Sequence, residues 1–214
     1  YCFSCGAGGN SIKFLMEFTR ANFSDVVLSL AKKNNIIVES LEGFQEEAYK
    51  KQLSRKEELY KILRISKNWF KNQLNNSLGK QAMNYLLSQR NLNSTIINHF
   101  DLGFAPDSWN DLFNYLSKVE KFPINLIVSS GLAISKENSN KIYDRFRNRL
   151  IIPIHDMQGR VVAFGGRSLD GQEPKYLNSP ESEVFEKGKM LFAFEKASSN
   201  IRKSDKAIVV EGYF

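Results

Sequence analysis

The amino-acid sequence predicts an α+β fold in which most helices precede the strands. Apolar residues recur at steps of three and four through roughly the first 130 residues, which is the period of an amphipathic helix. Beyond them, two β-rich runs at residues 143–154 and 160–169 flank the turn Met157-Gln158-Gly159. The pattern predicts helices over residues 10–19, 24–31, 45–76, 80–89, 94–100, 111–118, 124–130 and 191–201.

Single residues mark several boundaries between these elements. Asn10 and Ser24 are side chains that accept hydrogen bonds from the first backbone N–H groups of a helix. Gly79 separates two helices, and Gly131 stands where a helix-ending glycine belongs. Residues 36–43 break the helical pattern and predict a linker. The apolar run at residues 207–210 predicts a buried strand.

The composition is that of a folded protein, with 214 residues, 42 % hydrophobic residues and a formal net charge of +7. It contains no window of about 18 apolar residues, which excludes a membrane-spanning helix. Two cysteines form no disulfide framework and favour a reducing compartment. The positive charge serves either solubility or a polyanionic partner such as nucleic acid.

Both ends of the sequence are expected to be internal to a longer protein. The chain begins with Tyr1 rather than Met and stops soon after the apolar run at residues 207–210. We find no internal repeat of 20–50 residues in the sequence.

The segment Cys2-Phe3-Ser4-Cys5-Gly6 has the spacing of half a tetrahedral zinc site. Two thiolates separated by two residues can reach one ion, and the glycine lets the turn close around the sulfurs. A redox pair is the alternative, although no strand precedes it. His99 and His155 lie far away in periodic segments, so we interpret them as structural or exposed residues rather than as zinc ligands.

Arg145, Arg147 and Arg149 alternate along a predicted strand, so we expect all three guanidinium groups on one side and Phe146 on the other. Arginine suits bidentate contact with phosphate. The alternative is a solvated strand edge protected by charge.

Two further segments suit a binding surface. Gly165-Gly166 permits the close approach of a backbone or ligand, with Arg167 beside it. The loop between Pro174 and Pro180 combines a cation, an aromatic ring, an amide and a hydroxyl, which suits single-stranded nucleic acid, although a proline-braced turn is also possible. Glu211, directly after the apolar run, stands where a metal-binding or acid–base carboxylate is often found.

Seven segments, taken in order, resemble the signature of bacterial-type DNA primases, the DnaG family. They are residues Cys2 to Asn10, Gly103 to Pro106, Tyr143 to Arg149, Phe164 to Arg167, Pro174 to Glu181, Phe185 to Gly188 and Val209 to Tyr213.

This resemblance implies a DNA-directed RNA polymerase, a nucleotidyltransferase that makes short RNA primers on single-stranded DNA for replication. The implied domains are the end of a zinc ribbon (residues 1–40), a linker (41–52), the mixed α/β N-terminal subdomain of the primase core (53–203) and the first strand of a TOPRIM fold (204–214). The implied cofactors are zinc and magnesium or manganese. The implied partners are the DNA template, ribonucleoside triphosphates and a replicative helicase, the last bound through a C-terminal domain absent from this sequence. We expect a monomer without membrane contact, in the cytoplasm at the nucleoid, or in a plastid.

The resemblance also implies roles for particular residues. Cys2 and Cys5 correspond to zinc ligands, and Glu211 to the catalytic, magnesium-binding glutamate. The positions that correspond to the nucleic-acid and nucleotide surface are Arg90, Arg145, Arg147, Arg167, Lys175, Tyr176, Asn178 and Lys187.

Three positions depart from the family pattern: Asn91 stands where glycine is common, Glu186 where histidine is frequent, and Phe214 where methionine is usual. The further metal-binding aspartates are absent, so we expect this chain to bind single-stranded DNA without making primers.

The alternatives are another TOPRIM enzyme, such as a topoisomerase or nuclease, a non-catalytic single-stranded DNA-binding module, and a zinc-ribbon adaptor. The primase hypothesis requires the cations between Arg90 and Lys187 to form a continuous track toward Glu211.

Overall fold

The computed structural model describes residues 2–4, 6, 8–19, 21, 23–34, 36, 43–136 and 141–213, with the side chains of residues 43–49 left undescribed. The chain divides into two compact units, Tyr1–Gln52 and Leu53–Phe214, and each is described by itself. None of the helices in this described part of the chain is long and apolar enough to cross a membrane.

The first unit contains two short helices, α1 (Ser11–Thr19) and α2 (Phe23–Lys33), which contact each other. Asn10 caps α1 as predicted, since its side-chain oxygen accepts a hydrogen bond from the Lys13 backbone N–H at 2.9 Å. Among the described residues of this unit, only Val26 and Ala31 are buried, both in α2. Helix α3 (Gly43–Asn75) then begins inside the segment predicted as a linker.

The second unit is built on a four-stranded antiparallel sheet with strand order β1-β4-β5-β6. Its strands are β1 (Gly103–Ala105), β4 (Arg149–His155), β5 (Val161–Ser168) and β6 (Tyr176–Asn178). A separate pair consists of β2 (Ala133–Ser135) and β3 (Ile142–Asp144). Short helices complete the unit: η1 (Ser77–Gly79), α4 (Lys80–Asn84), η2 (Tyr85–Gln89), α5 (Ser94–His99), α6 (Asp111–Asn114), η3 (Tyr115–Val119), α7 (Ile124–Ser129), η4 (Lys187–Lys189) and α8 (Phe194–Ser204).

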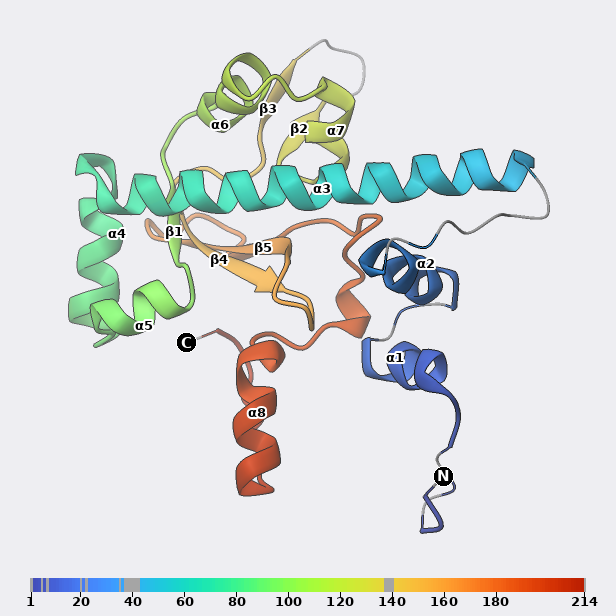
Figure 1. The fold of residues 1–214 in the computed structure, drawn as a ribbon. Coiled ribbons are helices and arrows are strands. Elements are labelled where there is room, and N and C mark those ends of the chain that lie inside the picture. The colour runs from blue at the N-terminus through green and yellow to red at the C-terminus, as the bar shows by residue number, and fades with distance from the viewer. Residues whose placement is uncertain are drawn as a thin grey trace. The chain divides into compact units, whose positions relative to one another are not determined.

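The long helix α3 packs along one face of this sheet, as Figure 1 shows. The rings of Phe70, Phe146 and Phe164 meet edge to face, with centroids 5.4–6.4 Å apart. Gly103 lets α3 approach β1, because a Cβ at that position would lie 2.6 Å from the Cβ of Phe70. Ile151 of β4 belongs to this first hydrophobic cluster.

The opposite face of β4 belongs to a second hydrophobic cluster. Leu150 and Ile152, the neighbours of Ile151, pack with Leu86 of η2 and Leu102, because side chains alternate between the two faces of a strand. The sheet is therefore covered on both sides, by α3 on one and by the α4–α5 region on the other.

The structure contains an internal repeat that the sequence analysis did not find. Its first copy is α4-η2-α5-β1 and its second is α6-η3-α7-β2, with η2, α5 and β1 each beginning 30 residues before its counterpart. The turns agree in hydrogen bonding, since Leu92 N–H donates to Leu86 C=O and Phe122 N–H to Leu116 C=O, both at 3.0 Å. Few residues are shared beyond Asn-Tyr-Leu at 84–86 and 114–116, which hides the repeat in the sequence.

The repeat explains the departure at position 91. Asn91 has a φ of +52°, and Lys121 at the equivalent turn has a φ of +61°. Glycine reaches this left-handed conformation without strain, and asparagine tolerates it better than most residues. Asn91 therefore adopts the left-handed turn that the glycine expected from the family resemblance would also adopt.

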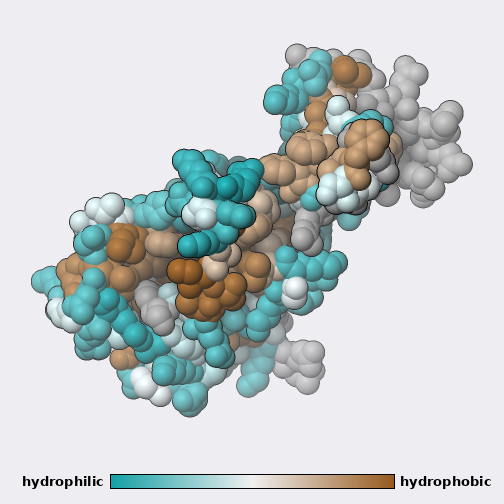
Figure 2. Space-filling model, turned by 90° about the horizontal axis from the view of Figure 1, so that it is seen from below, coloured by the Kyte–Doolittle hydropathy of each residue, from teal (hydrophilic) through white to brown (hydrophobic). Residues whose placement is uncertain are grey.

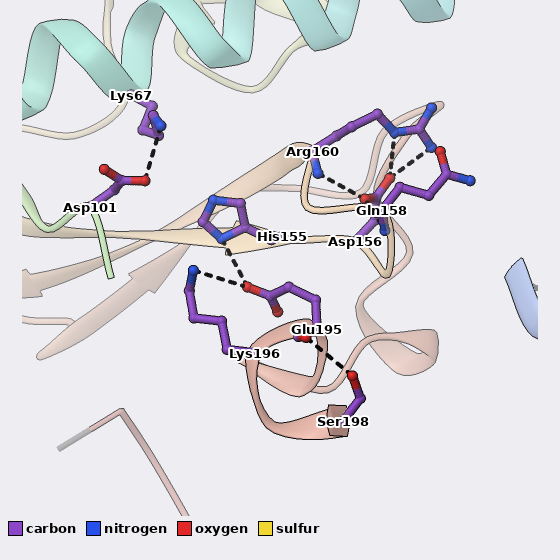
Figure 3. A network of polar contacts seen from close by, with 9 residues as sticks. All are labelled: Lys67, Asp101, His155, Asp156, Gln158, Arg160, Glu195, Lys196 and Ser198. Carbon is purple, nitrogen blue, oxygen red and sulfur yellow. Dashed lines mark hydrogen bonds and ion pairs between the residues drawn. The ribbon is translucent and has the colours of Figure 1, made fainter. Parts of the chain in front are cut away.

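Helix α8 contacts the end of β4 through the buried side chains of His155 and Glu195, shown in Figure 3. His155 Nδ1 lies 3.5 Å and Lys196 Nζ 3.6 Å from the same carboxylate oxygen of Glu195. Burial lowers the pKa of His155, which favours its neutral form. His155 is thus a structural residue and His99 is exposed, which confirms their interpretation from the sequence.

Asp144 connects β3 to the second copy of the repeat. Its carboxylate, in a residue only 3 % exposed, accepts hydrogen bonds from the backbone N–H groups of Leu112 and Phe113 at 2.9 and 2.8 Å. These groups lie in the first turn of α6, where no helical acceptor is available to them. The aspartate of the Tyr-Asp-Arg-Phe-Arg segment therefore has a structural role.

We predict that Asp144→Ala lowers the free energy of unfolding by about 2 kcal/mol, because two buried N–H groups lose their acceptor. Urea denaturation measures this change. Asp144→Asn keeps one acceptor oxygen and should cost less. Equal stability of Asp144→Ala and the original chain would contradict the assignment.

The same carboxyl group should make stability depend on pH. Burial raises the pKa of Asp144 from 3.8 to about 7, so the folded state binds its proton more tightly than the unfolded chain does. Its contribution is then complete below about pH 4 and is lost as the pH rises through about 7. Across this range, the original chain should lose stability relative to Asp144→Asn, and parallel profiles would contradict the prediction.

Candidate nucleic-acid interface

Two arginines from distant parts of the sequence meet at the ring of Tyr85 in η2. The guanidinium carbon of Arg90 lies 5.3 Å from the ring centroid, and its Nε donates a hydrogen bond of 2.6 Å to the Tyr85 hydroxyl. The guanidinium carbon of Arg167 lies 5.4 Å from the same centroid. Tyr85 therefore connects the first copy of the repeat to β5.

Arg167 continues this series of contacts into β6. Arg167 and Tyr176 are direct cross-strand partners, so their side chains share a face of the sheet. The guanidinium carbon lies 5.0 Å from the Tyr176 ring, and an N–H group donates to the Tyr176 hydroxyl. The Nε of Arg167 is buried and has no hydrogen-bond partner among the described residues.

Tyr213 and Asn178 extend the series to Arg145. The Tyr213 ring lies 6.0 Å from that of Tyr176, and its hydroxyl donates to the side-chain oxygen of Asn178 at 3.1 Å. Arg145 donates two hydrogen bonds of 3.0 and 3.1 Å to the Asn178 backbone carbonyl. We call Arg90, Tyr85, Arg167, Tyr176, Tyr213, Asn178 and Arg145 the arginine–tyrosine cluster.

The two glycines before Arg167 make room for aromatic rings. A Cβ at Gly165 would lie 2.9 Å from the Tyr213 hydroxyl, and one at Gly166 would lie 2.7 Å from the Phe146 ring. The close approach predicted for this pair is thus made by side chains of the chain itself, on opposite faces of β5.

An open pocket of about 650 Å³ lies beside the arginine–tyrosine cluster. Arg167 and the exposed Lys175 line it together. Of the eight residues predicted for the nucleic-acid surface, the cluster and this pocket bring together Arg90, Arg145, Arg167, Lys175, Tyr176 and Asn178.

The expectation that Arg145, Arg147 and Arg149 share one side of a strand is wrong. β3 ends at Asp144 and β4 begins at Arg149, so the residues between them form a bend. Phe146 is buried, as expected for the opposite side. Arg149 is only 6 % exposed and donates to the Pro174 carbonyl at 2.8 Å, so it braces the following loop.

Arg147 belongs to a different group of side chains. Its guanidinium carbon lies 4.4 Å from the Trp109 ring and 5.2 Å from the Tyr143 ring. Trp109 is 63 % exposed, so this group presents an aromatic surface beside a cation. Trp109 was not predicted as a site residue, although an aromatic residue in the polar loop Pro106-Asp107-Ser108-Trp109-Asn110 was a usable signal.

Lys187 is exposed in η4, outside the arginine–tyrosine cluster. Its neighbour Glu186 forms an ion pair of 2.9 Å with Lys189. The predicted continuous surface of cations is therefore formed only in part: six of the predicted residues lie in the cluster and the pocket beside it, and Arg147 and Lys187 lie outside both.

The strand expected at residues 207–210 is not formed. Ile208, Val209 and Val210 are 92, 86 and 74 % exposed, and they pair with no strand in the described part of the chain. A strand requires a neighbour for its backbone hydrogen bonds, which explains the difference. Glu211 follows in the same exposed segment. Figure 2, which views the molecule from below, shows that hydrophobic residues are exposed on that face.

Cys2 lies in a tight turn closed by a 2.9 Å hydrogen bond from Gly6 N–H to its carbonyl. Gly6 has a φ of +71°, which glycine adopts readily. Cys2 is exposed, and Cys5 lies outside the described residues. Within the described ranges, no three His, Cys, Asp or Glu side chains are grouped as metal ligands. The Cys-x-x-Cys spacing in the sequence still predicts half of a zinc site.

Comparisons with known proteins agree with this geometry. Residues 69–198 match the family described as the DNA primase catalytic core, N-terminal domain, and residues 1–46 match the CHC2 zinc finger. The DNA primase of Synechococcus elongatus is 51 % identical over all of this chain, which covers 31 % of that protein. The DNA primase of Synechocystis is 44 % identical, with 34 % of its length covered.

Solved structures show the same fold. The zinc-binding and RNA polymerase domains of the Aquifex aeolicus primase match 99 % of this chain and 49 % of that chain, with 30 % identity and a TM-score of 0.65. A DnaG primase catalytic domain bound to single-stranded DNA matches 75 % of this chain and 49 % of that chain, with 33 % identity and a TM-score of 0.67. The chain spans about a third of the length of these curated relatives. It belongs to the bacterial DnaG family of DNA primases.

Proposed function

We propose that this chain is the template-binding part of a DNA primase that makes RNA primers on single-stranded DNA. The observation that carries the proposal is the arginine–tyrosine cluster. Proteins that bind single strands combine cations along the phosphate backbone with aromatic rings on which bases stack. Arg167 stands between two tyrosine rings, so charge and stacking surface occur together there.

The exposed Trp109 and the half-buried Arg147 beside it would hold a second part of the same strand. Lys187 would contact the strand or an incoming ribonucleotide as a separate cation. The match to a primase bound to single-stranded DNA supports this function, although that ligand belongs to the other protein.

The proposed domains are the end of the zinc-binding domain at residues 1–40, a linker at 41–52, the N-terminal subdomain of the polymerase core at 53–203 and the start of a TOPRIM subdomain at 204–214. The second compact unit begins at Leu53, which agrees with the proposed start of the core. The complete enzyme would act at the nucleoid and contact the replicative helicase through another domain.

The proposed metals have different roles. Cys2 and Cys5 would supply two thiolate ligands to a structural zinc ion. Glu211 would hold a magnesium or manganese ion, which supplies stabilisation of the attacking and leaving oxygens in phosphoryl transfer. Such an ion needs several ligands, so this chain by itself should bind DNA without making primers.

We predict that Lys175→Ala weakens binding to single-stranded DNA several-fold, because one phosphate contact is lost. Fluorescence anisotropy with a labelled oligonucleotide measures this change. Lys118→Ala is the matched control, since Lys118 is also an exposed lysine and lies outside the cluster and the pocket. Arg167→Ala should weaken binding more, because Tyr176 loses its cation and Tyr85 keeps only Arg90. Urea denaturation checks the folding of this variant. Unchanged affinity in both variants would place the DNA elsewhere.

Binding should also weaken strongly with salt. If four to six cations contact phosphates, the logarithm of the binding constant should fall against that of salt concentration with a slope of about −3 to −4. Lys175→Ala should reduce the size of this slope by about 0.7. A flat response would contradict an interface based on cations.

In the complete primase, Cys2→Ser should lower the amount of tightly bound zinc, because a thiolate ligand is replaced by a hydroxyl. Atomic absorption after dialysis measures the metal. Ser4→Ala, inside the same turn, is the control and should retain zinc. Full zinc retention by Cys2→Ser would exclude this cysteine as a ligand.

A further inference from the structure

The wall of the pocket that faces Arg167 and Lys175 is built from uncharged polar side chains. Gln81, Asn84, Ser88 and Gln89 line it, from α4 and η2. Gln81, Asn84 and Ser88 share one side of the helical segment because they are three and four residues apart, and Gln89 lines the same pocket next to Ser88. We call these four residues the amide face.

The amide face has unused hydrogen-bonding capacity. All four residues are exposed, and their side chains make no hydrogen bond or ion pair with any described residue. Each glutamine or asparagine offers two donor hydrogens and an acceptor oxygen. The chain itself therefore gives no structural reason for three amides at these positions.

The repeat shows that the helix architecture does not require Gln81, Ser88 or Gln89, whereas Asn84 has an asparagine as its counterpart. The positions 30 residues later are Asp111, Asn114, Lys118 and Val119, in the same helical context of α6 and η3. The two copies differ in charge as well. Tyr85 accepts a hydrogen bond from Arg90, whereas Tyr115 donates one of 2.7 Å to Glu120. Only the first copy combines an amide face with a cation.

The opposite wall is held in place by several polar contacts. Arg149 donates to the Pro174 carbonyl at 2.8 Å, and Lys175 N–H donates to the Glu173 carboxylate at 3.0 Å. Ser168 donates to Asp170 at 2.9 Å. Lys175 and Arg167 thereby line the pocket together with the amide face.

These two walls suit the two ends of a nucleotide. Guanidinium and ammonium groups attract phosphate, whereas amide side chains hydrogen-bond to the edges of bases. Bases of single strands are recognised on their exposed edges while their faces stack on aromatic or guanidinium planes. The volume of about 650 Å³ lies within the range of ligand pockets, about 300–1,000 Å³.

We propose that the amide face reads the base of a nucleotide whose phosphate is held by Arg167 and Lys175. This inference rests on the proposed function and adds base preference to it. The same chemistry is offered by a nucleotide within the DNA strand and by a free ribonucleoside triphosphate, and the experiment separates these sources.

The test measures the affinity of the chain for labelled dA10, dC10 and dT10 by fluorescence anisotropy. The original chain should bind the three with unequal affinities. The double variant Gln81→Leu, Asn84→Leu should reduce the spread between the strongest and weakest ligand by at least about fivefold, the lower limit for a good base contact. Asn114→Leu, at the equivalent position of the second copy, should leave the spread unchanged.

Competition with ATP, CTP, GTP and UTP identifies the source of the nucleotide. If the original chain binds the three oligonucleotides with different affinities and the double variant removes that difference, the pocket binds a nucleotide of the DNA strand. If only the four triphosphates differ in affinity and the double variant removes that difference, the pocket binds a free ribonucleoside triphosphate. If the double variant changes neither spread, the inference is wrong.

Lys175→Ala distinguishes this failure from failure of the proposed function. It should weaken binding of all three oligonucleotides by the same factor, because it removes a phosphate contact. If Lys175→Ala weakens binding while the double variant alters no preference, DNA binding stands and base reading is excluded. If Lys175→Ala and Arg167→Ala both leave affinity unchanged, the proposed function fails together with the inference.

Discussion

The packing of Phe146 against Gly166 is the constraint on which the site depends. A Cβ at position 166 would lie 2.7 Å from the Phe146 ring, so the ring fits only over glycine. The ring also meets Phe70 of α3 and Phe164 of β5 in the core. Since Phe146 is fixed in a bend between β3 and β4, the arginines on either side of it leave the core in different directions.

The same region shows why an arginine-rich segment is not a uniform binding surface. Arg145 reaches Asn178, Arg147 stacks on Trp109, and Arg149 is buried beneath the loop that ends at Lys175. One arginine thus joins the arginine–tyrosine cluster, one serves a separate exposed aromatic group, and one is structural. Arginine can fill each role because its planar group stacks on rings and donates several hydrogen bonds.

The repeated helical motif supplies the second half of the site. Both copies use the same turn geometry and the same tyrosine, yet the residue five positions later is Arg90 in one and Glu120 in the other. The first copy also leads into β1, which pairs with β4 of the main sheet, whereas the second leads into β2, which pairs with β3. The same helical motif therefore places a cation, Arg90, beside the tyrosine that Arg167 contacts in the first copy. In the second copy it places an acidic residue, Glu120, beside the equivalent tyrosine.

Local periodicity and turn residues were enough to predict the order of most helices and the β4–β5 hairpin. The placement of Arg167, Lys175, Tyr176 and Asn178 on one surface came from the family resemblance. The sequence also indicated the family through short ordered motifs. Only the tertiary structure decided that Tyr85 and Tyr213 complete the cluster, that Arg149 is buried, and that residues 207–210 form no strand. These outcomes depend on contacts between segments far apart in the chain and on whether a strand finds a partner, and neither is encoded in the period of a single segment.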